Sequence, residues 1–249
     1  EPIDSQRECV ITMGKELKSS KERPIILRPI GFVRSRFRDT FTIPLEGSRA
    51  QIIIEKEYAK AIHGIEDFSH LFVICWLHLA DTAEYRKVLR IRPVRIDPKL
   101  PEQGAFASRS PIRPNPLSLT VVRLLEARGN TLTVSGMDVI DGTPVVDIKP
   151  YSPASDSHPS ALSSGIPLKG HEDHLTGVFY REATNFHGEG CPEIAIGTRM
   201  IIEGLSKMGI RDERDPNVKI TCLKTGCLAD AIQSVMGATL GGGRLIVLD

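Results

Sequence analysis

From residue 24 to about residue 150, hydrophobic positions form short runs that either alternate with polar residues or are apolar throughout. β-Branched and aromatic residues dominate these runs, and Gly, Pro and Asn separate them, which is typical of strands joined by turns. The pattern predicts strands at residues 25–33, 51–54, 71–79, 119–125, 131–139 and 145–148. So many strands with so few helices favour a closed or nearly closed β-barrel.

Three local features refine this barrel. Residues 71–79 are apolar on both faces, which predicts a central strand with His78 at its end. Residues 81–89 are compatible with a short helix. Gly129 and Asn130 lie between two predicted strands and indicate a hairpin.

Hydrophobic periodicity is lost over residues 152–170, where Pro, Ser and Gly dominate, and this indicates a linker or a long surface loop. Beyond it the pattern predicts helices at residues 192–208 and 228–236 and strands at residues 218–222 and 245–248. The apolar stripe of the first helix consists of Ile194, Ile201, Leu205 and Met208.

The expected fold is therefore mainly β, with a small N-terminal β-barrel domain and a smaller α+β C-terminal domain. We assign residues 1–23 to an N-terminal extension whose structure stays open, 24–153 to the barrel, 154–176 to a linker and 177–249 to the α+β domain. A length of 249 residues is ample for two domains of ordinary size.

The composition is that of globular domains. Hydrophobic residues make up 41% and charged residues 25% of the chain, which excludes collagen, extensive disorder and a coiled coil. The longest apolar run, residues 71–79, is about half as long as a membrane-spanning helix, and no signal segment opens the sequence. Five cysteines, an odd number without the spacing of a disulfide-rich domain, favour a reducing cytoplasm.

The net charge of +1 conceals a local asymmetry. Residues 86–123 carry nine basic side chains and only two acidic ones, a net charge of +7, so the rest of the chain carries −6. The basic side chains are Arg86, Lys87, Arg90, Arg92, Arg95, Lys99, Arg109, Arg113 and Arg123. Either this block attracts phosphates or carboxylates, or its cations pair with acids elsewhere in the fold.

Residues 106–117 form the most unusual segment, Phe-Ala-Ser-Arg-Ser-Pro-Ile-Arg-Pro-Asn-Pro-Leu. Three prolines within six residues stiffen the backbone, so Arg109 and Arg113 are presented on a loop that loses little entropy on binding. Rigid guanidinium groups suit a carboxylate or a phosphate.

Residues 141–151 read Asp-Gly-Thr-Pro-Val-Val-Asp-Ile-Lys-Pro-Tyr, a tight turn followed by a short strand. Strict alternation would place Asp147, Lys149 and Tyr151 on one face and Val146 and Ile148 on the other. Taken alone, the first four residues are simply a good β-turn.

Together, these two segments resemble the TrmO (YaeB/TsaA-like) family of S-adenosylmethionine-dependent tRNA methyltransferases. Residues 29–37 (Pro-Ile-Gly-Phe-Val-Arg-Ser-Arg-Phe) and 64–72 (Gly-Ile-Glu-Asp-Phe-Ser-His-Leu-Phe) resemble the same family in the same order, so that the resemblance spans residues 24–153. Ser108 stands where the family pattern has Thr, and Leu117-Ser118 replaces Ile-Gly.

The resemblance implies a barrel, usually a homodimer, that binds S-adenosylmethionine near the subunit interface and methylates N6 of the modified adenosine beside the anticodon of tRNA. By the family pattern, the cofactor-binding residues are Ser35, Arg36, Phe37, Leu77, His78, Arg109, Leu119, Asp141, Gly142, Thr143 and Pro144. Arg109 would hold the methionine carboxylate, main-chain groups of the Asp141 turn would read the adenine, and aromatic faces would stabilise the sulfonium. Without the resemblance, His78 is simply a hydrogen-bonded histidine at a strand end.

No catalytic base is assigned. An adenine N6 nucleophile can lose its proton after attack, so a strong base is not required and positioning supplies much of the rate. Asp147 and Tyr151 are the candidates if a base takes part. The basic residues 86–123 fit a tRNA substrate, since phosphate contacts would supply most of the affinity.

The second half carries another motif. Residues 186–197, Phe-His-Gly-Glu-Gly-Cys-Pro-Glu-Ile-Ala-Ile-Gly, resemble the Phe-His-Gly-His-x-Cys-Pro-Gly-x-x-x-Gly signature of the FmdE-like family, named for a subunit of formylmethanofuran dehydrogenase. Residues 227–233 and 241–245 fit the same pattern. Glu189 replaces a family histidine, and Glu193 replaces a family glycine.

His187, Cys191 and Cys227 are candidate ligands of a divalent metal such as zinc, three protein ligands with an open fourth position. Each cysteine precedes a predicted helix, whose N-terminal dipole favours the thiolate. The alternative is that these cysteines are simply buried. Cys222, in a predicted strand, is expected in the core.

Three functions stay open at this point. The first is an S-adenosylmethionine-dependent tRNA methyltransferase. The second keeps this cofactor, but the FmdE-like domain presents a small-molecule or metal-bound substrate to the barrel. The third is a non-catalytic protein that senses a metal or another ligand.

Overall fold

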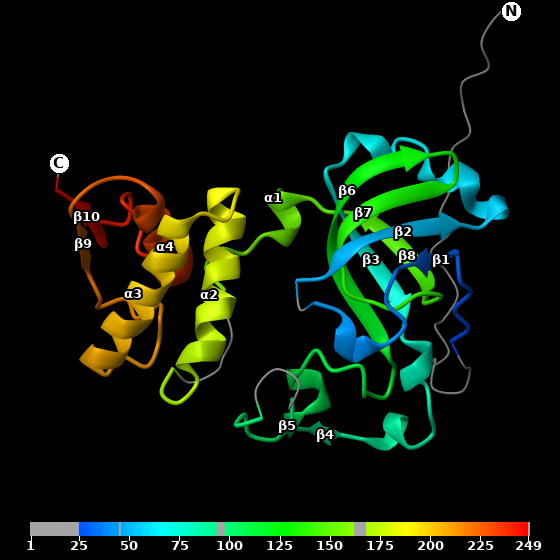
Figure 1. The fold of residues 1–249 in the computed structure, drawn as a ribbon, viewed down its shortest axis with the longest axis horizontal. Helices are drawn as coiled ribbons and strands as arrows, with labels where there is room; N and C mark the ends of the chain where they lie inside the picture. Colours follow the sequence, from blue (N-terminus) through cyan, green and yellow to red (C-terminus); the bar gives the residue numbers. More distant parts are fainter. Residues whose placement is uncertain (1–24, 45, 94–97, 162–167, 249) are drawn as a thin grey trace, which may run out of the picture.

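The computed structural model describes residues 25–44, 46–93, 98–161 and 168–248, so the extension 1–23 lies outside the described residues. The N-terminal part is a closed barrel of antiparallel strands in the order β1-β2-β7-β6-β3-β8 (Figure 1). These strands are β1 Gly31–Arg34, β2 Ser48–Ile54, β3 His70–Trp76, β6 Leu117–Arg128, β7 Thr131–Met137 and β8 Pro144–Pro150. The predicted barrel is confirmed, and so is the hairpin at Gly129 and Asn130, which joins β6 to β7.

Alternation of inward and outward side chains builds the barrel core. In β3, Leu71, Val73 and Cys75 are fully buried, and the residues between them are half-buried on the outer wall. Burying a Leu or Val side chain stabilises the fold by about 1.5–3 kcal/mol. Burial also raises the pKa of the Cys75 thiol to about 12, so this thiol stays protonated inside the barrel.

A β-bulge in β8 changes which of its side chains face the barrel interior. The register of β3 against β8 shifts between Ile74 and Cys75, and Val145 joins the buried core, with Ile148 packed against it. The strict alternation predicted for this strand is therefore wrong at Val146. Asp147 and Lys149 share one face as predicted, and an ion pair of 3.1 Å joins them.

The seam between β1 and β8 is the shortest in the barrel. These strands pair at only two positions, Gly31 with Val145 and Phe32 with Pro144. A Cβ atom at Gly31 would lie 2.3 Å from the carbonyl oxygen of Ile53 on β2, so glycine alone allows this close approach.

Three local predictions for the barrel are wrong. Residues 25–30 are irregular instead of extending β1, because Pro29 cannot donate a ladder hydrogen bond. β3 stops earlier than predicted, and His78–Ala80 form one turn of 3-10 helix. Residues 81–89 contain only a 3-10 turn, Tyr85–Lys87, because too few apolar side chains are available to bury a helical face.

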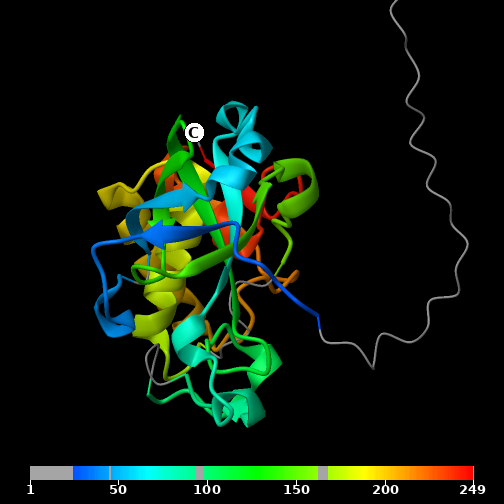
Figure 2. The ribbon, with the colours of Figure 1, turned by 90° about the vertical axis from the view of Figure 1, so that its right-hand side faces the viewer.

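Between β3 and β6, the described residues 77–93 and 98–116 form an excursion that extends from one end of the barrel (Figure 1 and Figure 2). A small antiparallel pair, β4 Arg90–Ile91 and β5 Gln103–Gly104, organises its centre. The excursion carries every basic residue of the +7 stretch except Arg123, although Arg95 lies outside the described residues.

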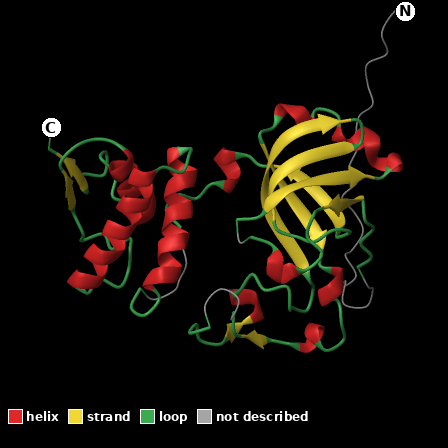
Figure 3. Cartoon of the chain, viewed as in Figure 1, coloured by secondary structure: helices red, strands yellow, loops and turns green. Residues whose placement is uncertain are grey.

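Helices dominate the C-terminal part, whereas strands gather in the barrel (Figure 3). The elements after the barrel are α1 Pro153–Asp156, α2 Glu172–His187, α3 Pro192–Met208, β9 Ile220–Cys222, α4 Cys227–Met236 and β10 Leu245–Val247. β9 and β10 pair in parallel. The predicted α+β character is thereby confirmed. Within the described ranges, no helix has the length and hydrophobicity that crossing a bilayer requires.

α2 is the element that the hydrophobic pattern did not predict. Its residues Leu175, Phe179 and Ala183, four positions apart, are buried in a core shared with α3 and α4. Because α2 begins at Glu172, the end of the predicted linker is helical, and α1 interrupts its beginning.

The remaining predictions for the C-terminal part hold, with one exception. In α3, Ile194, Ile201 and Leu205 are buried as expected. Met208 is 63% exposed, because it is the last residue of the helix, next to the cap. Cys222 is buried in the core, as expected.

Candidate functional site

A cavity of about 430 Å³ opens at the barrel end where β3 finishes and β6 begins. We call it the Arg109 cavity. The excursion, the first residues of β6 and the residue after β7 supply its lining: Leu77, Phe106, Arg109, Arg113, Asn115, Leu117, Ser118, Leu119, Thr120 and Asp138. Both arginines of the proline-rich loop therefore reach one cavity, together with two other predicted cofactor residues, Leu77 and Leu119.

Local hydrogen bonds hold the proline-rich loop in shape. The Ser108 hydroxyl donates to the carbonyl of Ala105 (3.1 Å) and accepts from the amide of Ser110 (3.4 Å). Arg113 Nη1 donates to the carbonyl of Ser108 (3.4 Å). Serine thus provides the hydroxyl contacts at the position where the family pattern has threonine.

Arg109 is oriented by the first residues of β6. Its Nη2 donates to the carbonyl oxygen of Leu119 at 2.6 Å. A guanidinium carries five N–H donors, so this contact fixes its orientation while using one of them. A carboxylate or phosphate in the cavity would meet an arginine that is already positioned.

Asp138 supplies a negative charge to the same cavity. The hydroxyl of Thr120, a residue that is only 8% exposed, donates to Asp138 Oδ1 at 2.6 Å and fixes the carboxylate. Sequence reasoning missed Asp138. The available signal was an acidic residue between two buried hydrophobic ones, Met137 and Val139, directly after a strand.

Three residues beyond Asp138, the Asp141 turn is tied to the segment that follows β1. Asp141 Oδ1 accepts from the amide of Ser35 (3.0 Å), and its own amide donates to the carbonyl of Phe37 (2.7 Å). The guanidinium carbon of Arg36 lies 4.8 Å from the centre of the Phe37 ring. The structure therefore brings two of the predicted segments, 35–37 and 141–144, into contact.

Within the turn, Gly142 has a φ of 75°, and the amide of Thr143 donates to the carbonyl of Ile140 (3.3 Å), as in a type II turn. The Thr143 side chain is buried, and its hydroxyl donates to the same carbonyl at 2.8 Å. Thr143 thus shapes the turn, and its side chain is not available to a ligand.

Pro144 lies in a second cavity, of about 570 Å³, which we call the Trp76 cavity. The two cavities share Asn115 and Leu117 in their linings, so they adjoin each other. His78 is exposed and lines neither of them.

The two candidate bases lie elsewhere. Asp147 is paired with Lys149 and lines a different cavity beside Ile148. The ring of Tyr151 packs against Phe72, with 5.4 Å between their centroids. Neither residue lines the Arg109 cavity.

The Trp76 cavity contains a charged contact that involves the chain's single tryptophan. Trp76 Nε1 donates to Asp81 Oδ2 (3.1 Å), and Arg86 Nε donates to Asp81 Oδ1 (2.5 Å). The hydrogen bond from Arg86 is the largest of the causes that hold the pKa of the Asp81 carboxyl below its usual value.

This contact predicts the acid behaviour of tryptophan fluorescence. A lowered carboxyl pKa means that the ion pair is complete above the unfolded value of about 4 and is lost only as the pH falls through the lower, folded value. We therefore expect selectively excited Trp76 fluorescence to stay constant from neutral pH to about pH 4 and to change below it. Asp81→Asn should remove this acid transition, and a transition centred above pH 4 would contradict the assignment.

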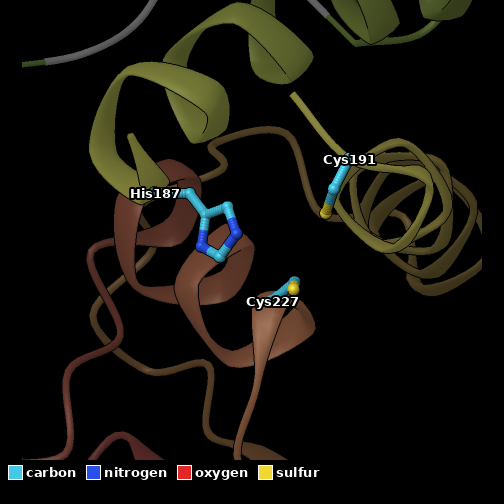
Figure 4. Close-up of side chains that lie close together, drawn as sticks. All are labelled: His187, Cys191 and Cys227. Carbon is cyan, nitrogen blue, oxygen red and sulfur yellow. The ribbon is translucent and has the colours of Figure 1, made fainter. Parts of the chain in front are cut away.

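A second group of chemically reactive side chains lies in the helical part. His187 is the last residue of α2, Cys191 caps the N-terminus of α3, and Cys227 begins α4. Figure 4 shows the three side chains turned toward one another, and their ligand atoms all lie within 4.8 Å of each other. The structure thus brings the three predicted metal ligands together.

Neighbouring groups orient these ligands. Asp230 Oδ2 lies 2.8 Å from His187 Nδ1, an arrangement that fixes the imidazole ring and leaves Nε2 for a metal. Cys191 Sγ accepts from the amide of Ile194 at 3.3 Å.

The pKa of the Cys227 thiol is raised to about 11, mainly by its hydrogen bond with the Cys191 thiol, then by burial and by the Glu193 carboxylate. In the metal-free chain, these neighbours act at Cys227 against the thiolate that a helix N-terminus would favour. A thiol and a carboxylate close to Cys227 disfavour the negative charge of its thiolate. A bound divalent cation would favour that charge and lower the thiol pKa. Two thiols and an imidazole are a donor set that fits zinc.

A closed barrel with an arginine-lined cavity at one end, followed by helices that carry a His/Cys cluster, defines a two-part class of protein. The family model described as the tRNA-methyltransferase O N-terminal domain matches residues 32–157, and the chain belongs to this family. A second model, described as FmdE, Molybdenum formylmethanofuran dehydrogenase operon, matches residues 186–249. Both resemblances expected from the sequence are confirmed.

Several known proteins are similar to this chain. A probable S-adenosyl-L-methionine-binding protein of Archaeoglobus fulgidus is 38% identical over 231 residues, which cover 90% of this chain and 61% of that protein. A protein of the same description from Methanothermobacter thermautotrophicus is 45% identical over 137 residues, 53% of this chain and 94% of that protein. The tRNA (adenine(37)-N6)-methyltransferase of Escherichia coli is 34% identical over 146 residues, 54% of this chain and 61% of that protein.

A crystal structure of TrmO from Pseudomonas aeruginosa matches with 31% identity and a TM-score of 0.47, covering 57% of this chain and 62% of that one. The chain thus spans about three fifths of the length of the Archaeoglobus and Escherichia relatives.

Proposed function

We propose that this chain is an S-adenosylmethionine-dependent methyltransferase that methylates N6 of the modified adenosine beside the anticodon of tRNA. The observation that carries the proposal is the Arg109 cavity, where a pre-positioned arginine and an oriented carboxylate face the same space. The names of the archaeal relatives support the cofactor, and the name of the Escherichia coli relative supports the reaction.

The two charges in the cavity suit the methionine part of the cofactor. Arg109 would bind the carboxylate, since Leu119 already holds its guanidinium in place. Asp138, held by Thr120, would face the amino group or the sulfonium. Phe106, which is 79% exposed at the rim, offers an aromatic face to the adenine or the sulfonium.

S-Adenosylmethionine supplies an electrophilic methyl group when it is bound. The task of the chain is then to hold the acceptor nitrogen in line with that group, and such positioning can account for much of the rate. Neither Asp147 nor Tyr151 lines the cavity. The proposal therefore assigns no base and lets the adenine proton leave after attack.

The excursion would hold the tRNA. Arg86 and Arg90 are engaged by Asp81 and Glu102, so part of the charge is neutralised locally. Lys87 and Arg92 are exposed. Phosphate contacts there would position a base at the neighbouring cavity, since such contacts fix register without reading sequence.

The test is complementation in an Escherichia coli strain that lacks its own tRNA (adenine(37)-N6)-methyltransferase. We expect expression of the full chain to restore the N6-methylated nucleoside beside the anticodon, measured by mass spectrometry of digested tRNA. Purified protein, tRNA from the same strain and S-adenosylmethionine should give the same product in vitro. The Arg109→Ala variant should give less product at the same S-adenosylmethionine concentration, because it binds the cofactor more weakly.

Unchanged tRNA in both assays would reject tRNA as the substrate. If the protein still bound S-adenosylmethionine, the second function would replace this proposal, namely that the FmdE-like part presents a small-molecule or metal-bound substrate to the barrel. If it bound no S-adenosylmethionine, a non-catalytic sensor would remain.

We also propose that His187, Cys191 and Cys227 hold a divalent metal such as zinc. We infer two modules, a barrel at residues 24–153 and a helical FmdE-like module. The core of the second module includes Leu168 and Leu175, so it begins inside the linker predicted at residues 154–176 and ahead of residue 177. The two separate hydrophobic cores support this division. Cytoplasmic thiols stay reduced, which suits both the cysteine ligands and a tRNA substrate.

A homodimer is proposed from the outer wall of the barrel. Cross-strand neighbours Phe72 and Val121, and Ile74 and Leu119, place apolar side chains side by side on that wall. Leu119 is 49% and Val121 44% exposed. An apolar patch of this kind marks an interface, and through Leu119 it adjoins the Arg109 cavity.

A further inference from the structure

Glu193 stands where the FmdE-like pattern has glycine, and the structure places it beside the His/Cys cluster. It lies two residues after Cys191, in the first turn of α3. The Glu193 carboxylate is one of the groups that raise the pKa of the Cys227 thiol, after Cys191 and burial. Glu193 Oε2 also lies 3.9 Å from the position that a Cβ atom would occupy on Gly226, the residue before Cys227.

The second acidic departure is placed differently. Glu189 lies in the exposed loop between α2 and α3. Two acidic residues of this chain depart from the family signature, and Glu193 is the one that lies beside the segment carrying a candidate metal ligand.

We propose that Glu193 is the fourth ligand of the metal site, and that it closes the coordination that the three family residues leave open. The inference rests on the metal site proposed above. In the metal-free chain, the Glu193 carboxylate lies beside the residue that precedes Cys227, outside the group of three ligand atoms within 4.8 Å, so the proposal requires its side chain to turn toward the ion when the metal binds.

A closed site has a different chemical role from an open one. Three protein ligands plus water can bind and polarise a substrate, whereas four protein ligands make a structural zinc site. His187, two cysteines and Glu193 would hold the ends of α2, α3 and α4 together around one ion. The metal would then stabilise the module instead of presenting a substrate to the barrel.

Glu193 also has a simpler role available. A carboxylate in the first turn of a helix interacts favourably with the helix dipole, for about 0.3–1 kcal/mol. If this is its only role, substitution of Glu193 lowers stability but leaves the absorption spectrum of a bound metal ion unchanged. Metal spectroscopy therefore distinguishes a helix-dipole role from a ligand role.

The experiment loads the full chain with Co²⁺ in place of zinc and titrates it with azide, a small anion that binds only where a coordination position is open. We expect the wild-type visible bands to resist azide. In Glu193→Gln, the bands should shift with azide, and Co²⁺ affinity should fall by about tenfold to a hundredfold. Glu189→Gln and Glu203→Gln, which change carboxylates in the neighbouring loop and on the same helix, should behave as wild type.

Each outcome decides a separate point. Absence of a thiolate-to-Co²⁺ charge-transfer band in the wild type would overturn the metal site itself. A wild-type band that shifts with azide would show an open site and overturn the role of Glu193, as would a response in Glu189→Gln alone. Circular dichroism checks that Glu193→Gln folds, and Glu193→Gly, which restores the family residue, repeats the azide test if it does not.

Discussion

Replacing Arg109 by alanine is expected to weaken S-adenosylmethionine binding by about tenfold to a hundredfold, the loss that follows when a charged hydrogen bond worth about 1.5–3 kcal/mol is removed. The guanidinium is held by the carbonyl of Leu119 at the cavity wall, so it is oriented before the proposed methionine carboxylate binds. Arg113 lines the same cavity, but it is engaged by the carbonyl of Ser108. Isothermal titration calorimetry of the full chain measures the change.

The controls separate charge from geometry. Arg128→Ala removes an exposed arginine at the far end of β6 and should leave the affinity as it is. Arg109→Lys keeps the charge but loses the planar fork, and it should recover only part of the affinity. Equal dissociation constants for wild type and Arg109→Ala would contradict the proposed cofactor site.

The second large effect concerns the metal. Cys227→Ser is expected to abolish stoichiometric zinc in the purified chain, because it removes one thiolate from a cluster of three close ligands. Structural zinc contributes directly to folding free energy, so the thermal transition of the helical module should fall by several degrees. The transition of the barrel should stay in place, since its core contains none of these residues. Elemental analysis and calorimetry provide the two measurements.

Cys222→Ser is the matched control. Cys222 is buried in the same core, 4% exposed, and its thiol donates to the carbonyl of Lys224. This variant should be destabilised through packing while it keeps its zinc. Zinc retained by Cys227→Ser, or lost from Cys222→Ser, would contradict the assigned ligands.

Much of the barrel can be predicted from the sequence because burial inside a barrel alternates residue by residue. The alternation is plain in β2 and β3, where every second residue is buried. It fails in β8, because a bulge changes the facing of Val145 and Val146, and a bulge has no hydrophobic signal of its own.

The helix α2 was missed for a related reason. Only Leu175, Phe179 and Ala183 are buried, so the apolar stripe is thin. The residue at its N-cap, His171, makes no side-chain capping bond, and a Pro- and Ser-rich segment precedes it. Neither a start signal nor a broad stripe marked the helix.

Some residues of the candidate sites could likewise be predicted from the sequence, and others could not. Arg109 and Arg113 could be predicted because three prolines within six residues stiffen the loop that carries them. Asp138 could not, since its role depends on β7 ending beside Thr120 of β6, a contact that only the folded barrel creates. Glu193 was visible as a departure from a pattern, but its position beside Cys227 depends on how α3 and α4 pack.

The two-residue pairing between β1 and β8 continues beyond both strands. The amide of Ile30 donates to the carbonyl of Val145 (2.7 Å), the amide of Val33 donates to the carbonyl of Thr143 (2.9 Å), and the amide of Gly142 donates to the carbonyl of Val33 (2.8 Å). The last two bonds involve residues of the Asp141 turn, so the turn itself completes the hydrogen bonding that closes the barrel. A substitution that distorts this turn therefore disturbs the closure of the barrel together with a predicted cofactor-binding segment.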